Sequence, residues 1–162
     1  MRIVIDDLTG PDIAALLEAH VAELKSISPP ESKHALDLEG LRQPGTTMWS
    51  AWEGDELVGC AALKDLGQGH AELKSMRVAT AHQGKGIATV LLKHLLTAAL
   101  ELGYTRISLE TGAMDFFAPA RKLYQKHGFD LCEPFGDYKA DPNSVFMTRE
   151  VDNASRHPSD PS

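Results

Sequence analysis

Shortages of cysteine, of long apolar runs and of positive charge each exclude a class of protein. Cys60 and Cys132 are the only two cysteines in 162 residues. They lack the spacing of a disulfide framework or a zinc site, so we expect buried, reduced thiols. Apolar stretches such as 60–63 fall far short of the roughly 20 residues that a membrane span needs. The 16 lysines and arginines are outnumbered by 23 aspartates and glutamates, and the formal net charge of −7 argues against general nucleic-acid binding.

The composition otherwise matches an ordinary globular protein. Apolar residues make up 43% and charged residues 24% of the chain. The length suits one domain, which we expect over residues 1–151, and the proline-containing, polar stretch 152–162 predicts a disordered tail. The first residues reach acidic side chains at Asp6 and lack the apolar core of a signal peptide, so a cytoplasmic location is expected.

Apolar periodicity predicts an α+β fold. Strands are expected over residues 2–5, 46–53, 56–66, 70–78, 105–110, 129–133 and 144–151. Helices are expected from Pro11 onward and over 33–43, 86–102 and 116–127. The helix over 86–102 has a predicted apolar stripe of Ile87, Val90, Leu91, Leu95, Ala99 and Leu102.

The most informative stretch is the turn Gln83–Thr89, which joins the strand 70–78 to the helix 86–102. Its glycines let a ligand approach the backbone closely, and the first amides of the following helix favour a phosphate or pyrophosphate. The spacing fits neither a P-loop nor a dinucleotide-binding G-x-G-x-x-G fingerprint, because Thr89 stands at the third glycine position. A purely structural glycine turn is the alternative.

Two motifs in the chain resemble those of the GNAT superfamily of acetyl-CoA-dependent N-acetyltransferases. Gln83, Gly86 and Ala88 match its Q/R-x-x-G-x-G/A turn, and 120–129 is similar to its A-x-x-L-Y-x-K-x-G-F motif. The similarity covers about residues 45–150. It implies a mixed, mostly antiparallel sheet of about six or seven strands, flanked by about four helices.

The resemblance also implies a set of contacts to acetyl-CoA, the expected co-substrate. Val78 would offer its amide to the thioester carbonyl, and such a preorganised donor stabilises the negative charge of acyl transfer. Family members often carry asparagine where this chain has Phe117, so Phe117 is expected to pack against the co-substrate. The implied contact residues are Met76, Arg77, Val78, Gln83, Gly84, Lys85, Gly86, Ile87, Ala88, Thr89, Phe117 and Ala120.

Glu72 and Tyr124 are the candidate catalytic residues. An amine with a pKa near 10 must lose a proton before it attacks, and Glu72 stands where several family members carry their base. If Glu72 is not the base, Glu110 or an ordered water is the next candidate. The alternative for Glu72 is an exposed strand carboxylate without a catalytic role. Tyr124 occupies the family position of the acid that assists the leaving thiolate, with a core tyrosine as its alternative.

These patterns favour an enzyme that acetylates a primary amine of a small molecule. A non-catalytic acyl-CoA-binding module and a protein or peptide amine acetyltransferase are the alternatives. The seven histidines show no ligand spacing, so no metal is expected, although His34 follows a Pro-Pro loop that would border the acceptor site. Family members often dimerise, but the sequence shows no self-complementary apolar patch on which to base a homodimer.

Overall fold

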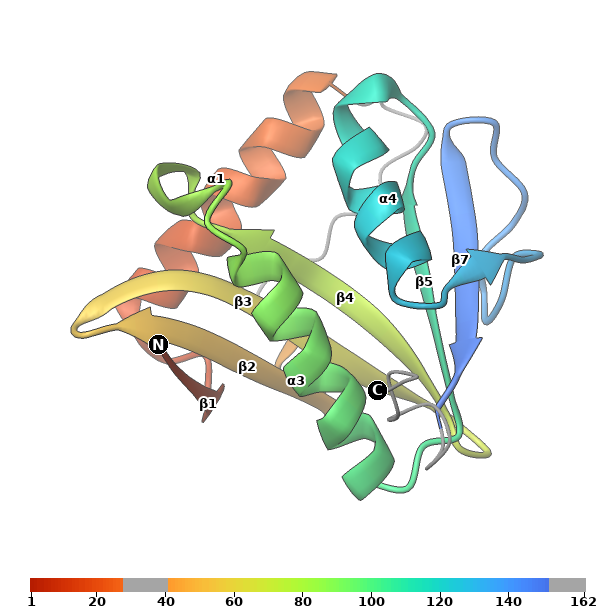
Figure 1. The fold of residues 1–162 in the computed structure, drawn as a ribbon, viewed down its shortest axis with the longest axis horizontal. Helices are drawn as coiled ribbons and strands as arrows, with labels where there is room; N and C mark the ends of the chain where they lie inside the picture. The colour runs from red at the N-terminus through yellow and green to blue at the C-terminus, as the bar shows by residue number, and fades with distance from the viewer. Residues whose placement is uncertain (28–40, 152–162) are drawn as a thin grey trace. The chain divides into compact units, whose positions relative to one another are not determined.

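The computed structural model describes residues 1–27 and 41–151, and it confirms the α+β fold (Figure 1). Its strands are β1 (Arg2–Asp6), β2 (Thr46–Glu53), β3 (Glu56–Gly67), β4 (His70–Val78), β5 (Arg106–Gly112), β6 (Asp130–Leu131) and β7 (Ser144–Glu150). The α-helices of the described ranges are α1 (Pro11–Ile27), α3 (Ile87–Glu101) and α4 (Ala118–Lys126), with 3-10 turns at Thr80–His82 and Asp115–Phe117.

The strands form one mixed sheet in the order β1-β2-β3-β4-β5-β7-β6. β4 and β5 run parallel, whereas β1 with β2, β2 with β3, β5 with β7 and β6 with β7 are antiparallel. The parallel register covers His70–Leu73 of β4. Two residues later, Ser75 has a φ of 55°, which interrupts the extended conformation of β4 as a bulge residue does.

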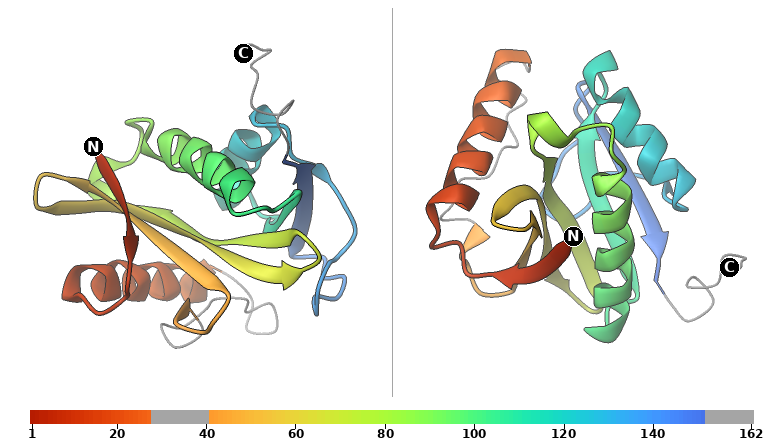
Figure 2. Two further views of the ribbon diagram at one scale, coloured as in Figure 1. Left: turned by 90° about the horizontal axis from the view of Figure 1, so that it is seen from below. Right: turned by 60° about the vertical axis from the view of Figure 1, so that its left-hand side comes forward.

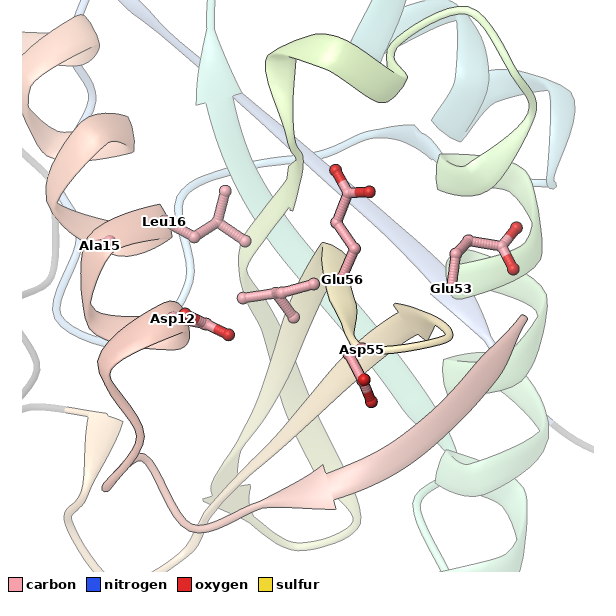
Figure 3. A pocket seen from close by; sticks show the side chains of 7 residues that line it. Asp12, Ala15, Leu16, Glu53, Asp55 and Glu56 are labelled. Carbon is pink, nitrogen blue, oxygen red and sulfur yellow. The ribbon is translucent and has the colours of Figure 1, made fainter.

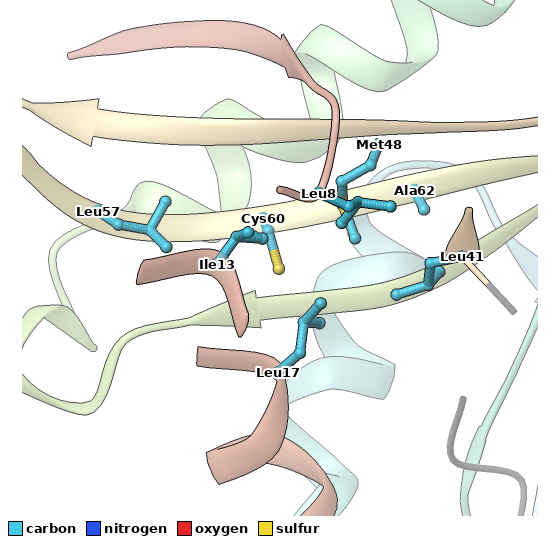
Figure 4. Close-up of a cluster of buried hydrophobic side chains, with 8 residues drawn as sticks. All are labelled: Leu8, Ile13, Leu17, Leu41, Met48, Leu57, Cys60 and Ala62. Atoms are coloured by element: carbon cyan, nitrogen blue, oxygen red, sulfur yellow. The ribbon is translucent and has the colours of Figure 1, made fainter. Parts of the chain in front are cut away.

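The chain divides into two compact units. The first contains Met1–Lys64 and Lys74–Leu95, and the second contains Asp65–Leu73 and the chain from Leu96 onward. In the first unit, β2 and β3 separate α1 from α3 (Figure 2). The core on the α1 side is formed by Leu8, Ile13, Leu17, Leu41, Met48, Leu57, Cys60 and Ala62 (Figure 4). The core on the α3 side is formed by Ala51, Val58, Ile87 and Leu91.

The second unit is built on the β5–β7 ladder, which runs from Arg106 paired with Glu150 to Gly112 paired with Ser144. α4 lies over β5 (Figures 1 and 2). Alternate residues of the strands, including Leu73, Leu109 and Met147, are buried apolar side chains. The residues between them make a polar face, described below.

Both cysteines are free thiols. Cys60 is fully buried, as expected, and burial raises the pKa of its thiol to about 12. Cys132 differs from its prediction. It is only half-buried, because it follows β6, an edge strand of the sheet whose own residues are exposed. Its amide donates to the Phe146 carbonyl oxygen (2.8 Å).

The predicted stripe on α3 is wrong at two positions. Val90 is 45% exposed and Leu102 is 56% exposed, whereas Leu92, outside the stripe, is 1% exposed. Leu102 follows the end of α3 at Glu101, and the buried face instead turns through Leu92. The predicted helix over 33–43 and the tail 152–162 fall largely or wholly outside the described residues, as does His34.

Gly59 sets the close packing of β3 against α3. A Cβ at this position would lie 2.9 Å from Leu91 Cδ1 and 3.0 Å from the Arg77 carbonyl oxygen. Leu91 has no exposed surface and so no room to withdraw. We therefore expect Gly59→Ala to destabilise the protein by about 1–3 kcal/mol, measured by chemical denaturation. Lys93→Ala on the exposed face of α3 is the control and should change stability by less than about 0.5 kcal/mol. Equal stability of Gly59→Ala and the parent would contradict this packing.

Candidate active site

The turn between β4 and α3 has a backbone conformation that suits a bound anion. Gly84 and Gly86 both have a φ of 81°, a conformation that other residues rarely adopt. A Cβ on either glycine would meet no heavy atom within 4 Å, so the backbone is open to a ligand. α3 starts at Ile87 without an acidic residue in its first turn. A helix N-terminus of this kind favours a phosphate through its first amides and its dipole.

Side chains of the first unit link this turn to its surroundings. Gln83 donates from Nε2 to the Val78 carbonyl oxygen (3.4 Å), which ties the turn to the end of β4. Lys85 contacts His82 (Nζ to Nδ1, 3.4 Å), and His82 in turn pairs with Glu56 (2.8 Å). Lys85 is the cation of the turn and stays exposed, so it is available to a phosphate.

The remaining predicted contacts of the first unit are apolar or backbone contacts. Met76 and Val78 are half-buried and pack on the core beside α3. Ile87 is buried in that core, which leaves its amide rather than its side chain for a ligand. Ala88 and Thr89 are half-buried in the first turn of α3, and Arg77 is half-buried on β4.

In the second unit, Glu72 is a buried carboxylate. It is 4% exposed, so the alternative of an exposed strand carboxylate is wrong. Tyr138 donates a hydrogen bond from its hydroxyl to Glu72 Oε2 at 2.6 Å. Burial is the largest cause that raises the pKa of Tyr138, followed by this hydrogen bond and then by the charges of Glu72 and Glu110. The phenol is therefore firmly protonated and remains a donor.

Glu110 lies on the same face of the sheet as Glu72. Glu72 is paired with Ser108 in the parallel register, and Glu110 follows Ser108 by two residues, so all three side chains point to one side. Ser144 donates a hydrogen bond from Oγ to Glu110 Oε2 at 2.7 Å. Each of the two carboxylates thus receives a hydroxyl donor from the C-terminal part of the chain.

The same face continues as a chain of polar contacts. His70 Nε2 lies 2.7 Å from Ser108 Oγ, and Ser108 Oγ lies 2.8 Å from Thr148 Oγ1. Arg106 donates to Thr148 Oγ1 at 2.9 Å. Burial lowers the pKa of His70, and the Arg106 charge lowers it further against the opposing charge of Glu72. His70 therefore favours its neutral form near pH 7.

Tyr124 is a buried residue of α4. Its side chain is 8% exposed, and burial raises its pKa to about 12. Its ring meets the Phe129 ring edge-on at 5.7 Å between centroids. The ring of Tyr124 therefore packs as that of a core tyrosine does. A catalytic role for its hydroxyl stays a prediction.

Phe117 and Ala120, the other predicted contacts of the second unit, are half-buried. The Phe117 ring covers Gly112 so closely that a Cβ there would overlap it. The predicted helix over 116–127 is a 3-10 turn through Phe117 followed by α4 from Ala118, with Pro119 in its first turn.

Sequence reasoning missed Tyr138 and Ser144 as partners of the two glutamates. Tyr138 stands 66 residues from Glu72, and Ser144 stands 34 residues from Glu110. No local sequence spacing predicts either pair. The one signal was the aromatic composition of 135–138, which is unusual for an exposed loop.

A separate hollow of about 580 Å³ lies in the first unit and contains no predicted site residue (Figure 3). It is lined by Asp12, Ala15, Leu16, Glu53, Asp55, Glu56 and Leu57. Glu53 already pairs with the N-terminal amine (3.3 Å) and Glu56 with His82.

Within the described ranges, no three histidine, cysteine or acidic side chains are grouped as metal ligands. No helix among the described residues is both long and apolar enough to span a membrane.

Comparisons with solved structures show the fold. An acetyltransferase of the GNAT family from Staphylococcus aureus superposes with a TM-score of 0.71 at 21% identity, covering 93% of this chain and 100% of that one. A Bacillus subtilis acetyltransferase in complex with CoA superposes with a TM-score of 0.69 at 22% identity, covering 93% of this chain and 98% of that one.

Comparisons of sequence show the family as well as the fold. The chain is 56% identical over 151 residues to the uncharacterized N-acetyltransferase YsnE of Bacillus subtilis, covering 93% of this chain and all of that protein. It is 48% identical to the uncharacterized N-acetyltransferase YedL of Escherichia coli, covering 90% and 92%. It is 35% identical to the IAA acetyltransferase of Azospirillum brasilense, covering 86% and 90%. The model of the acetyltransferase (GNAT) family matches residues 13–129, and the chain therefore belongs to this family and is an acyltransferase of the N-acetyltransferase type.

Proposed function

We propose that the protein transfers the acetyl group of acetyl-CoA directly to a primary amine of a small molecule. The observation that carries the proposal is the open glycine turn before α3, with φ of 81° at Gly84 and at Gly86. Its backbone suits the pyrophosphate of CoA, with Lys85 as a supporting cation. The CoA bound by the structurally similar Bacillus subtilis acetyltransferase supports the same co-substrate.

Glu72 is the proposed base of this reaction. The acceptor amine arrives as an ammonium with a pKa near 10, and a carboxylate that takes its proton leaves a lone pair for attack. The new C–N bond forms at the thioester carbonyl carbon, the C–S bond breaks, and the sulfur leaves as a thiolate. The proton on Glu72 passes to solvent, and the second proton lost by nitrogen neutralises the thiolate.

Tyr124 is the proposed partner of that thiolate. A thiol has a pKa near 8.5, well below the value of about 12 for Tyr124. The phenol therefore stays protonated, and it stabilises the departing sulfur chiefly as a hydrogen-bond donor. Such a donor acts where charge develops, so its effect falls on turnover rather than on binding.

A panel of primary amines tests the proposal directly. CoA thiol release is measured with acetyl-CoA and each amine, and IAA, the compound in the name of the Azospirillum relative, is included as a further acceptor. Amine-dependent thiol release supports the proposal. Tight acetyl-CoA binding without turnover on any acceptor would favour the non-catalytic module, and release only with peptides would favour a protein or peptide acceptor.

Replacement of Gly86 by aspartate tests the turn. Gly86→Asp adds bulk and negative charge where the pyrophosphate approaches, so we expect acetyl-CoA affinity to fall about 10-fold or more in calorimetry. Gly86→Ala, like Gly86→Asp, places a side chain at a left-handed φ, but it adds no charge. It should therefore lose less acetyl-CoA affinity than Gly86→Asp. Parent-like affinity in a folded Gly86→Asp protein would remove the turn from the co-substrate site.

Replacement of Tyr124 by phenylalanine tests the thiolate partner. Tyr124→Phe keeps the ring against Phe129 and deletes only the hydroxyl, so turnover should fall about 10²-fold while acetyl-CoA affinity stays close to that of the parent. Tyr104→Phe, a change of the same size elsewhere in the second unit, is the control. If both variants turn over like the parent, Tyr124 serves packing alone.

Replacement of Glu72 by glutamine tests the base. Glu72→Gln keeps the size and the acceptor for Tyr138 but cannot take a proton. We expect its activity to fall most at low pH and to approach that of the parent as pH nears the pKa of the amine, since a neutral amine needs no base. A ratio that stays constant across pH contradicts this role, and a pH-dependent loss in Glu110→Gln instead would transfer it to Glu110.

A further inference from the structure

Tyr138 is fixed in place from two directions. Its ring lies 5.2 Å from the Phe135 ring and 5.5 Å from the Phe146 ring, measured between centroids, and Phe135 and Phe146 meet edge-on at 5.9 Å. Phe146 is a buried residue of β7. The three rings hold the segment before β7 against the polar face of the sheet.

The hydroxyl of Tyr138 reaches the one buried carboxylate of that face. The donor–acceptor distance of 2.6 Å is in the range of charge-assisted O–H···O⁻ bonds, which are short and strong. Phenylalanine in place of Tyr138 would pack the same rings equally well. The ring contacts therefore do not require the hydroxyl, whose contact is the bond to Glu72.

We propose that Tyr138 is a positioning residue for proton transfer, whose hydroxyl holds the Glu72 carboxylate in the orientation that takes the proton from the acceptor amine. This inference rests on the proposed function, in which Glu72 is the base. An ionised carboxylate accepts hydrogen bonds at about four lone-pair sites, so one bond to Tyr138 does not exhaust it.

The charges around Glu72 explain why such a donor matters. Glu110, on the adjacent strand, adds a second negative charge to the same face. Arg106 supplies a positive charge, but its guanidinium donates to Thr148 and lies 3.9 Å from the Glu150 carboxylate. Neutral His70 bonds Ser108. A hydroxyl donor on Glu72 fixes the direction in which its carboxylate faces, beside the like charge of Glu110. Tyr138 thus orients the base.

An alternative role for the bond is to anchor the segment before β7 to the sheet. Loss of an anchor would lower stability and leave the pH dependence of catalysis unchanged. Loss of a positioning donor would change catalysis through Glu72 alone, so the two roles differ in measurable ways.

The experiment uses the full chain and the best amine of the panel. We expect Tyr138→Phe to lower kcat about 10-fold and to leave the acetyl-CoA KM unchanged. The acidic limb of the kcat/KM profile should move to higher pH, because the carboxylate has lost a hydrogen-bond donor. In a Glu72→Gln background the same change should alter kcat by less than about 2-fold, since the group it positions is gone.

Two variants serve as controls. Ser144→Ala removes the hydroxyl donor of Glu110, the other carboxylate, and Tyr104→Phe removes a phenol elsewhere in the second unit. Both should leave the acidic limb in place. Thermal unfolding of every variant measures any anchoring role separately.

Each outcome bears on the inference. Additive effects of Tyr138→Phe and Glu72→Gln, or an unmoved acidic limb in Tyr138→Phe, overturn the positioning role and leave the proposed function standing. Full activity of Glu72→Gln with an active parent overturns Glu72 as base and the role of Tyr138 with it. A parent that acetylates no amine overturns the proposed function itself, and with it the role of Tyr138.

Discussion

The burial of the Glu72 carboxylate is the constraint on which the rest of the second unit depends. A carboxylate that is 4% exposed loses most of its hydration, and hydrogen-bond donors must replace that water if it is to stay ionised. Tyr138 is such a donor, so the segment that carries it must lie against the sheet. The rings of Phe135 and Phe146 hold it there. The aromatic residues before β7 and the acidic residues on β4 and β5 are therefore parts of one arrangement.

In the first unit, the main constraint is that the backbone of the turn after β4 stays accessible. The turn after β4 needs two left-handed residues in close succession, and glycine supplies both at little cost. Gln83 ties this turn to Val78, and buried Ile87 anchors the start of α3 in the core. The helix amides are thus presented by a rigid support, which reduces the ordering that a bound anion must bring about.

Local patterns allowed much of this to be predicted from the sequence. The predicted strands 46–53 and 70–78 have the bounds of β2 and β4, because residues that favour strands are flanked there by turn residues. The glycine turn and the start of α3 follow from local spacing. The identity of Glu72 and Tyr124 as candidates came from resemblance to a family. The burial of Tyr124 was one of two readings that the sequence left open, and the burial of Glu72 could not be predicted, because it depends on what the chain folds over it.

The rest depends on contacts between distant residues. Tyr138 and Glu72 are joined across 66 residues, and no periodicity encodes such a pair. The exposure of Val90 depends on which face of α3 meets its neighbours, and the period of a helical stripe does not specify that face in detail. Cys132 is half-buried because it follows β6, an exposed edge strand of the sheet. In each case, tertiary packing decided what the local pattern left open.

The most direct test of the account follows the acetyl group itself. Acetyl-CoA with an isotopically labelled acetyl group is incubated with the protein and a primary amine, and the products are resolved by mass spectrometry. An N-acetyltransferase of this kind should place the label in an N-acetyl product that forms only when protein and amine are both present. Label that stays on CoA, or that appears as free acetate whether or not an amine is added, would contradict it.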